Sequence, residues 1–284
     1  MITVENLYHS YKAKEEYAVK DISFHVSEGE VLGFLGPSGA GKSTTQNVLT
    51  GLLTLQKGNA VIAGVDVRKP TKELYNSIGV SFESPNLYGK LTGYENLDFH
   101  RKLYDVETED PLDLLRMVGL YDDARKKAQA YSRGMKHRLV FARSMLNRPK
   151  IWFLDEPTTG LDPTTANSIK NIIKEKNKAG TTIFLTTHNM HVADELCHRV
   201  AFINEGKLLL VDSPRNLKLK YGQKSVDVEY TTKEGLKKAE LSLEDEKDRH
   251  TLNDLITGGQ VEMMHTKEAT LEEIFIKVTG RGLV

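Results

Sequence analysis

The sequence predicts an α/β fold in which a parallel sheet carries a phosphate-binding loop. A short apolar strand, Glu30–Leu35, leads through a glycine-rich loop into a helix that includes Val48. Two later apolar runs, Ile151–Leu154 and Thr182–Thr186, are separated by a polar helix around Thr165–Ala179. Short apolar runs joined by a crossover helix are typical of buried parallel strands.

The remaining elements follow from local patterns. Further short strands are expected before and after the loop, at Ile2–Glu5, Ala18–Phe24 and Asn59–Ala63. A helix-rich insert is expected over residues 91–148, because Thr92 and Glu95 have the spacing of a capping box at a helix start. Near residue 204, Asn-Glu-Gly joins the apolar runs Val200–Ile203 and Lys207–Val211, which predicts a hairpin.

The character of the chain changes after about Pro214. Residues 218–250 are rich in charge and carry no chemical motif. Thr270 and Glu273 again have capping-box spacing, and four apolar residues then share one helical face: Leu271, Ile274, Phe275 and Val278. We therefore expect one large domain over residues 1–215 and a small appended subdomain over residues 216–284.

Composition and cysteine content narrow the class of protein, although a local basic face is compatible with the overall charge balance. The 284 residues are 39% hydrophobic, and 39 basic residues balance 39 acidic ones, which counts against a nucleic-acid binder. The single cysteine, Cys197, permits no internal disulfide and favours a reducing compartment. No signal peptide and no apolar run of the roughly 20 residues that span a membrane is found. Any membrane-spanning part is expected on another chain.

The glycine-rich loop fits the Walker A pattern for nucleotide phosphates. Its backbone N–H groups can converge on phosphate oxygens, and the helix that follows adds its positive end. Lys42 would contact the β- and γ-phosphates, and the Ser43 hydroxyl would bind Mg²⁺. The alternative is a plain glycine turn before a helix, which the preceding strand disfavours. The loop comprises Gly36, Pro37, Ser38, Gly39, Ala40, Gly41, Lys42, Ser43 and Thr44.

The strand that begins at Ile151 ends in two residues with carboxylate side chains. Asp155 is the expected second holder of Mg²⁺, beside Ser43. Glu156 can act as general base for an attacking water. The alternative is a strand that simply ends in acidic residues, which the Walker A loop makes the weaker interpretation. The side chain of Trp152 is expected in the core.

His188 follows the strand Thr182–Thr186 and should lie at the same sheet edge as Gly36 and Asp155. There it could hydrogen-bond the γ-phosphate and the attacking water. Position alone does not distinguish this role from that of a polar residue at a strand end.

A further motif precedes the strand Ile151–Leu154. Its residues are Tyr131-Ser132-Arg133-Gly134-Met135-Lys136-His137-Arg138. Here the chain resembles ATP-binding cassette (ABC) proteins, and more narrowly the ATPase subunits of drug exporters of the daunorubicin-resistance kind. The resemblance covers about residues 2–215. It implies a RecA-like core with an antiparallel β subdomain and a helical insert, and it implies ATP and Mg²⁺ as cofactors.

The resemblance assigns further roles. Ser132 is a good N-cap for a helix whose apolar stripe is Met135, Leu139, Ala142 and Leu146. By the resemblance, Ser132 and Gly134 would face the γ-phosphate that a second cassette binds. Tyr11 matches the aromatic residue that stacks on adenine, with Tyr8 and Tyr17 as competitors. Asp162 belongs to the D-loop at the dimer interface, and His188 becomes the switch histidine.

Three positions depart from the family pattern. Glu83 replaces the Q-loop glutamine, so it can approach Mg²⁺ and water but cannot donate as an amide does. Arg133 replaces a signature glycine and adds a cation near the sandwiched phosphate. His137 stands where the family often has glutamine, and its role is left open.

The expected function is hydrolysis of Mg·ATP by a dimer of cassettes, identical or not, to power a separate membrane permease. The chain would bind this permease through residues 84–97 at the cytoplasmic face of the membrane. A non-transport ABC ATPase, acting in assembly, repair or on ribosomes, is the alternative, and a P-loop kinase is a third reading. The transported substrate is not encoded in these motifs.

Overall fold

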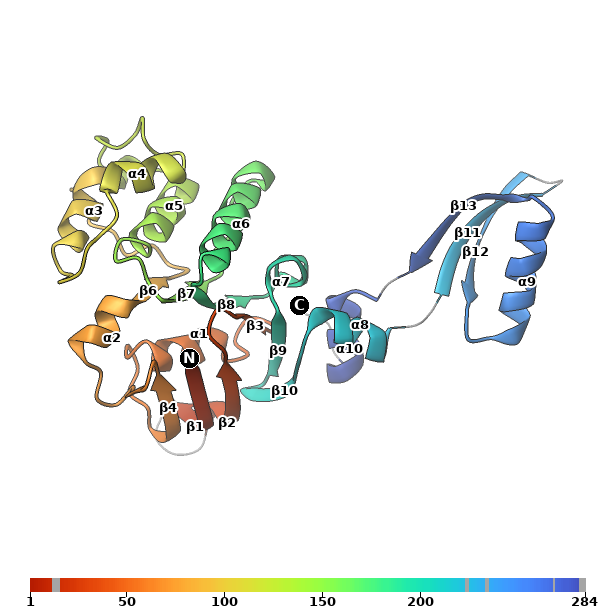
Figure 1. The fold of residues 1–284 in the computed structure, drawn as a ribbon, viewed down its shortest axis with the longest axis horizontal. Helices are drawn as coiled ribbons and strands as arrows, with labels where there is room; N and C mark the ends of the chain where they lie inside the picture. Colours follow the sequence, from red (N-terminus) through yellow and green to blue (C-terminus); the bar gives the residue numbers. More distant parts are fainter. Residues whose placement is uncertain (12–15, 223–224, 233–234, 268, 281–284) are drawn as a thin grey trace. The chain divides into compact units, whose positions relative to one another are not determined.

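The computed structural model describes residues 1–11, 16–222, 225–232, 235–267 and 269–280 of the 284-residue chain. It divides into two compact units. The first is Met1–Ser213 and the second begins at Pro214. Each unit is described by itself below (Figure 1).

An antiparallel sheet of four strands opens the first unit, in the order β2-β1-β4-β5. Buried and exposed residues nearly alternate along β2, so one face of the sheet packs on the core. The three predicted strands are confirmed, although each of them extends beyond the bounds that its local pattern indicates. The bounds are β1 Ile2–Ser10, β2 Tyr17–Val26, β4 Lys57–Ile62 and β5 Val65–Asp66.

The second sheet has six strands in the order β10-β9-β3-β8-β7-β6. The five strands from β9 to β6 are parallel, and β9 forms the predicted hairpin with antiparallel β10. Every residue of β3, β7 and β8 is buried, as expected for strands covered on both faces. The bounds are β3 Val31–Leu35, β6 Ile78–Ser81, β7 Ile151–Asp155, β8 Thr182–Thr187, β9 Arg199–Asn204 and β10 Lys207–Asp212.

Helices α6 and α7 connect parallel strands directly, whereas α1 and α2 lead between the parallel sheet and the antiparallel sheet. Trp152, in β7, is fully buried as predicted, and its indole N–H donates to the hydroxyl of Ser144. Cys197 is buried against Gly33 of β3. The connecting helices are α1 Lys42–Leu49, α2 Lys72–Ser77, α6 Pro163–Lys178 and α7 Met190–Leu196.

The predicted helical insert lies between β6 and β7. Thr92 and Glu95 form the predicted capping box at the start of α3. The hydroxyl of Ser132 caps α5 by accepting from Met135 N at 3.2 Å. This helix ends at Arg143, so Leu146 is buried in the turn beyond it and not on the helix. The helices are α3 Gly93–Arg101, α4 Pro111–Met117, the 3₁₀ turn Ala128–Ala130 and α5 Arg133–Arg143.

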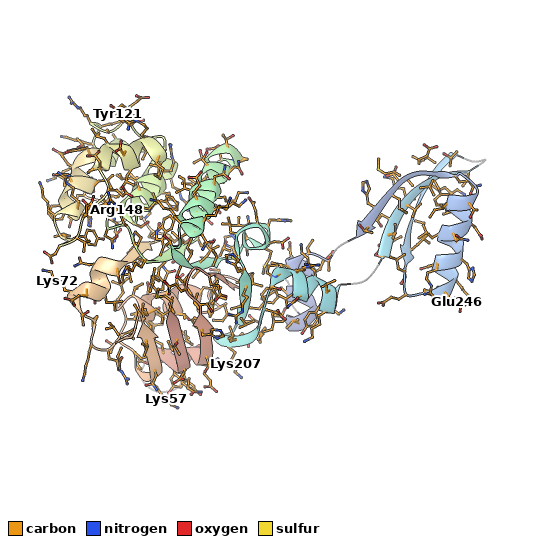
Figure 2. All side chains as sticks on the ribbon, in the orientation of Figure 1. Lys57, Lys72, Tyr121, Arg148, Lys207 and Glu246 are labelled. Atoms are coloured by element: carbon orange, nitrogen blue, oxygen red, sulfur yellow. The ribbon has the colours of Figure 1, made fainter. Side chains whose placement is uncertain are left out.

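Figure 2 shows Lys57, on β4, and Tyr121, in the helical insert, at opposite ends of the first unit. The parallel sheet lies between them. The part of the chain that the structure describes contains no helix long and apolar enough to cross a membrane.

The two sheets meet at Ala18. A Cβ atom added to Gly41 would lie 2.7 Å from the carbonyl oxygen of Ala18, and one added to Gly206 would lie 2.6 Å from it. The N–H of Lys20 donates to Gly206 O at 2.7 Å. The antiparallel sheet therefore touches the loop before α1 and the β9–β10 turn through backbone, where only glycine fits.

The second unit has its own core. Its sheet has the order β12-β11-β13, and α9 packs against it through Leu255. The second predicted capping box, at Thr270, starts α10. The elements are α8 Pro214–Tyr221, β11 Ser225–Thr232, β12 Gly235–Ser242, α9 Glu246–Thr257, β13 Val261–Lys267 and α10 Leu271–Thr279.

Candidate active site

The candidate site is a pocket of about 420 Å³ at the carboxyl edge of the parallel sheet. It gathers residues that follow β3, β6, β7 and β8, because parallel strands deliver their carboxyl ends to one edge. Its walls are Tyr11, Ala18, Ser38, Gly39, Gly41, Lys42, Ser43, Thr44, Glu83, Glu156 and His188.

The loop between β3 and α1 has the backbone that the glycines predict. Gly39 and Gly41 have φ of 78° and 107°, which side chains rarely allow. Gly36 has no room for a side chain, since a Cβ there would lie 2.1 Å from Ile203 O. Ala40 is buried, and the carbonyl oxygen of Pro37 accepts a hydrogen bond from Lys42 Nζ.

Lys42 is buried and turned toward its own loop. Its Nζ donates to Gly36 O at 2.7 Å and to Pro37 O at 3.0 Å, and it lies 4.0 Å from Glu156 Oε1. Burial lowers the pKa of Lys42 below its ordinary value, although Glu156, Asp155 and Glu83 raise it. A buried ammonium group needs anionic acceptors, and phosphate oxygens would meet that need.

Ser43 and Asp155 are brought into direct contact. The Ser43 hydroxyl donates to Asp155 Oδ1 at 3.2 Å, and the Thr186 hydroxyl donates to the same oxygen. Burial raises the pKa of Asp155, against the lowering effect of these two hydroxyls. A hydroxyl and a carboxylate side by side are hard oxygen donors of the kind that hold Mg²⁺ with phosphates and water. The residues present therefore fit this ion.

Glu156 is buried and accepts four hydrogen bonds. Oε1 accepts from the backbone N–H of His188 at 2.9 Å and from its Nδ1 at 2.7 Å. Oε2 accepts from the hydroxyls of Thr159 and Thr187, both at 3.0 Å. The carboxylate is thus fixed in the pocket wall, opposite Lys42.

The ring of His188 is the most accessible partner of this carboxylate. Its side chain is 55% exposed, whereas that of Glu156 is 6% exposed. Because a carboxylate only accepts, Nδ1 of His188 carries the proton in this contact. A ring held at one atom and otherwise exposed can turn toward a ligand in the pocket.

Tyr11 and Glu83 line the mouth of the pocket. The Tyr11 ring is 64% exposed, and its hydroxyl lies 3.0 Å from Thr44 Oγ1. Tyr8 and Tyr17, the competing aromatics, pack on each other edge to face and do not line this pocket. Glu83 is exposed just after β6.

Ser132, Gly134 and Asp162 are not among the walls of the pocket. Ser132 and Asp162 are exposed N-caps of α5 and α6, and Gly134 is half-buried on the first turn of α5. A Cβ on Gly134 would lie 3.7 Å from Leu161, so the starts of these two helices are neighbours. The structure brings together the Walker residues and leaves these three on a separate surface of the same unit.

Sequence reasoning missed the hydroxyls that hold the two carboxylates. Thr159, Thr186 and Thr187 each donate to Asp155 or Glu156. The sequence shows a pair of threonines just before His188, which a search for donors at the next strand end could have found.

Comparison with known proteins agrees with this geometry. Residues 19–159 match the ABC transporter family model, and residues 203–279 match the C-terminal domain of DrrA1-3-like ATP-binding proteins. A fluoroquinolones export ATP-binding protein of Mycobacterium tuberculosis is 47% identical over all of this chain and 94% of its own length. The linearmycin resistance ATP-binding protein of Bacillus subtilis is 34% identical over 76% of this chain and 70% of its own.

Solved structures give the same fold. A dimeric ATP-binding cassette in a post-hydrolysis state, bound to ADP and Pi, superposes with a TM-score of 0.70 at 28% identity. The match covers 75% of this chain and 98% of that one. An ATP-binding subunit of an ABC transporter superposes with a TM-score of 0.71 at 25% identity, over 78% of this chain and 93% of that one.

These matches decide between the expected classes of protein. They favour an export ATPase over the non-transport alternative, and cassettes of this fold form dimers. The chain belongs to the ATP-binding and hydrolysing subunits of ABC transporters, of the drug-exporter type with a DrrA-like C-terminal domain.

Proposed function

We propose that this chain hydrolyses Mg·ATP between two cassettes and thereby drives a separate membrane permease that exports amphiphilic drugs or antibiotics. The observation that carries the proposal is the pocket lined by Lys42, Ser43 and Glu156, with Asp155 hydrogen-bonded to Ser43 beside it. The names of the similar export proteins support the substrate class. The unit Met1–Ser213 would be the catalytic cassette.

The loop and Lys42 bind the phosphates in this proposal. The Lys42 ammonium exchanges Gly36 O and Pro37 O for phosphate oxygens, which are stronger acceptors. Tyr11 presents its exposed ring to the adenine. Mg²⁺, held by Ser43 and Asp155 with Glu83 nearby, would neutralise charge on the β- and γ-phosphates.

Glu156 acts as the general base. All four acceptor positions of its carboxylate are in use, so one donor has to leave before a water can bind there. The His188 ring is the most exposed of these donors. Its departure toward the terminal phosphate would free Oε1 to accept the proton of the attacking water.

The second cassette completes the site. Ser132 and Gly134 are exposed or half-buried at the start of α5, where free N–H groups and a hydroxyl form an anion site. Asp162 lies on the neighbouring turn. In the proposed dimer these residues face the nucleotide of the partner, and residues 84–97 contact the permease at the cytoplasmic face of the membrane.

The test is Glu156→Gln, which keeps the shape of the side chain and removes the base. We expect ATP hydrolysis to fall by at least about a hundredfold while ATP affinity stays within about threefold. The variant should also accumulate as a dimer in Mg·ATP on size-exclusion chromatography. His191→Gln, on the exposed face of α7, is the control and should behave as wild type. Wild-type turnover by Glu156→Gln would refute the assignment of the base.

A further inference from the structure

His137 connects helix α5 to the turn that follows Glu156. It lies on α5, the helix that Ser132 caps, and its Nδ1 is 3.2 Å from the carbonyl oxygen of Thr159. A carbonyl oxygen only accepts, so the ring nitrogen must donate. The contact therefore fixes both the tautomer and the orientation of the ring.

Thr159 continues the connection to the general base of the same chain. Its hydroxyl donates to Glu156 Oε2 at 3.0 Å, and its backbone N–H donates to Glu156 O at 3.1 Å. The turn between β7 and α6 is thus held to the base on one side and to α5 on the other. Any shift of α5 that moves His137 pulls on the residue that orients the base.

The start of α5 packs closely on this turn. A Cβ on Gly160 would lie 3.6 Å from Nε of Arg133, and one on Gly134 would lie 3.7 Å from Leu161. Gly160 has φ of 74°, a conformation that glycine adopts without strain and that residues with a side chain rarely adopt. The two segments should therefore move together.

Burial lowers the pKa of His137, and Arg133 lowers it further, whereas the bond to Thr159 and the charge of Glu83 raise it. The ring is consequently neutral at pH 7, with its proton on the nitrogen that donates to Thr159. A glutamine side chain can supply an N–H donor at this distance from the backbone, and a leucine of similar size cannot.

We propose that His137 is a positioning residue, which through Thr159 couples the phosphate-sensing start of α5 to Glu156 of the same chain. The inference rests on the proposed function, because the proposed function places Ser132 against the nucleotide that the partner cassette binds. Contact of α5 with that nucleotide would then set the orientation of the base that serves the chain's own nucleotide. Hydrolysis at the two sites of the dimer is thereby coupled within each chain.

The experiment compares His137→Leu, His137→Gln and wild type in steady-state ATP hydrolysis by the full chain. His137→Leu should lower kcat about fivefold to tenfold and leave the KM for ATP within about twofold, because the ring does not line the pocket. His137→Gln should restore kcat to within about twofold of wild type. His25 is exposed on β2, so His25→Leu and His25→Gln are the matched controls and should change neither kcat nor KM.

Thr159→Val removes the hydroxyl and keeps the carbonyl. It should lower kcat by a similar factor. The double variant Thr159→Val, His137→Leu should show a loss of kcat no larger than that of the more impaired single variant, because both substitutions break the same connection. An unchanged kcat in His137→Leu, an equal loss in Leu and Gln, or full additivity would each overturn the inference. His137→Ala replaces the leucine variant if that protein does not fold, as judged by its thermal melting.

The outcome is separable from the test of the proposed function. If Glu156→Gln is inactive and His137→Leu has wild-type kcat, only the coupling is wrong. If Glu156→Gln is active, the assignment of the base is wrong and the coupling falls with it.

Discussion

Glu156 has a backbone conformation that few residues other than glycine adopt, with φ of 49°. Such a conformation costs on the order of 1 kcal/mol and persists only where the surroundings determine it. Here the N–H of Glu156 donates to Thr186 O at 3.0 Å, and the carboxylate accepts four further bonds. The strained backbone therefore sets the position of the Glu156 carboxylate, which is the proposed base, and its bonds to residues of β8 and of the following turn hold it there.

Asp155 is a second residue whose proposed role opposes the stability of the folded chain. Burial raises its pKa above the ordinary 3.8, so the ionised carboxylate destabilises the folded chain without nucleotide. This cost is fully present at pH values above the raised folded pKa. As the pH falls toward 3.8 the folded state takes up the proton first, and the cost is removed.

Asp155→Asn should therefore stabilise the nucleotide-free protein at pH 7, by on the order of 1 kcal/mol. The difference in stability between the variant and wild type should shrink as the pH is lowered. In the variant, Mg²⁺ should no longer strengthen ATP binding. Thermal melts at several pH values, with and without Mg·ATP, measure both effects. A variant less stable than wild type at pH 7 would show that its hydrogen bonds outweigh the cost of the buried charge.

At the residue scale, the sequence predicts the identities of Lys42, Ser43 and Asp155, because the spacing of a phosphate loop is local. The donors to the carboxylates are not local. Thr186 lies beside Asp155 only because β7 and β8 pair in that register, and Thr159 reaches Glu156 only because the turn folds back. A single sequence does not specify such pairings.

At the scale of elements, the two capping boxes and the β9–β10 hairpin were predictable because each depends on a few adjacent residues. The extent of β1 was not. It continues to Ser10 because it pairs with β2 on one side and β4 on the other, with irregularities in both registers. The order of the six-stranded sheet, with β3 between β9 and β8, likewise depends on long-range packing.

Gly79 shows how tightly the helical insert meets the parallel sheet. A Cβ there would lie 2.1 Å from Ser144 O, next to the end of α5, and 2.8 Å from the ring of Pro149. Because backbone blocks the space, Gly79→Ala should destabilise the protein by at least about 3 kcal/mol. Gly89→Ala is the control, since its nearest atom, Gln129 Cβ, is at an ordinary 3.4 Å. Chemical denaturation measures both, and equal stability of the two variants would contradict this account.

At the scale of the whole molecule, the two units have separate cores. In the second unit, Val226, Val228, Leu241 and Leu255 form a cluster of their own. The pocket belongs entirely to the first unit. A ligand that binds one unit stabilises that unit alone when the two unfold independently.

Calorimetry should therefore resolve two unfolding transitions. Mg·ATP at about 100 times its Kd should stabilise the first unit by about 2.7 kcal/mol and leave the second transition in place. Hydrolysis is best blocked with Glu156→Gln during the scan. One single transition that shifts as a whole would mean that the units unfold together.

The backbone contacts at Ala18 have a consequence for which ligands the pocket accepts. Since Ala18 O packs on Gly41, β2 is held against the phosphate loop. The Tyr11 hydroxyl lies 3.0 Å from Thr44 Oγ1, which ties the Tyr11 ring to the helix that follows this loop. Under the proposed function, the number of phosphates on a nucleotide, and not an adjustment of the loop, would decide whether its far end reaches Glu156.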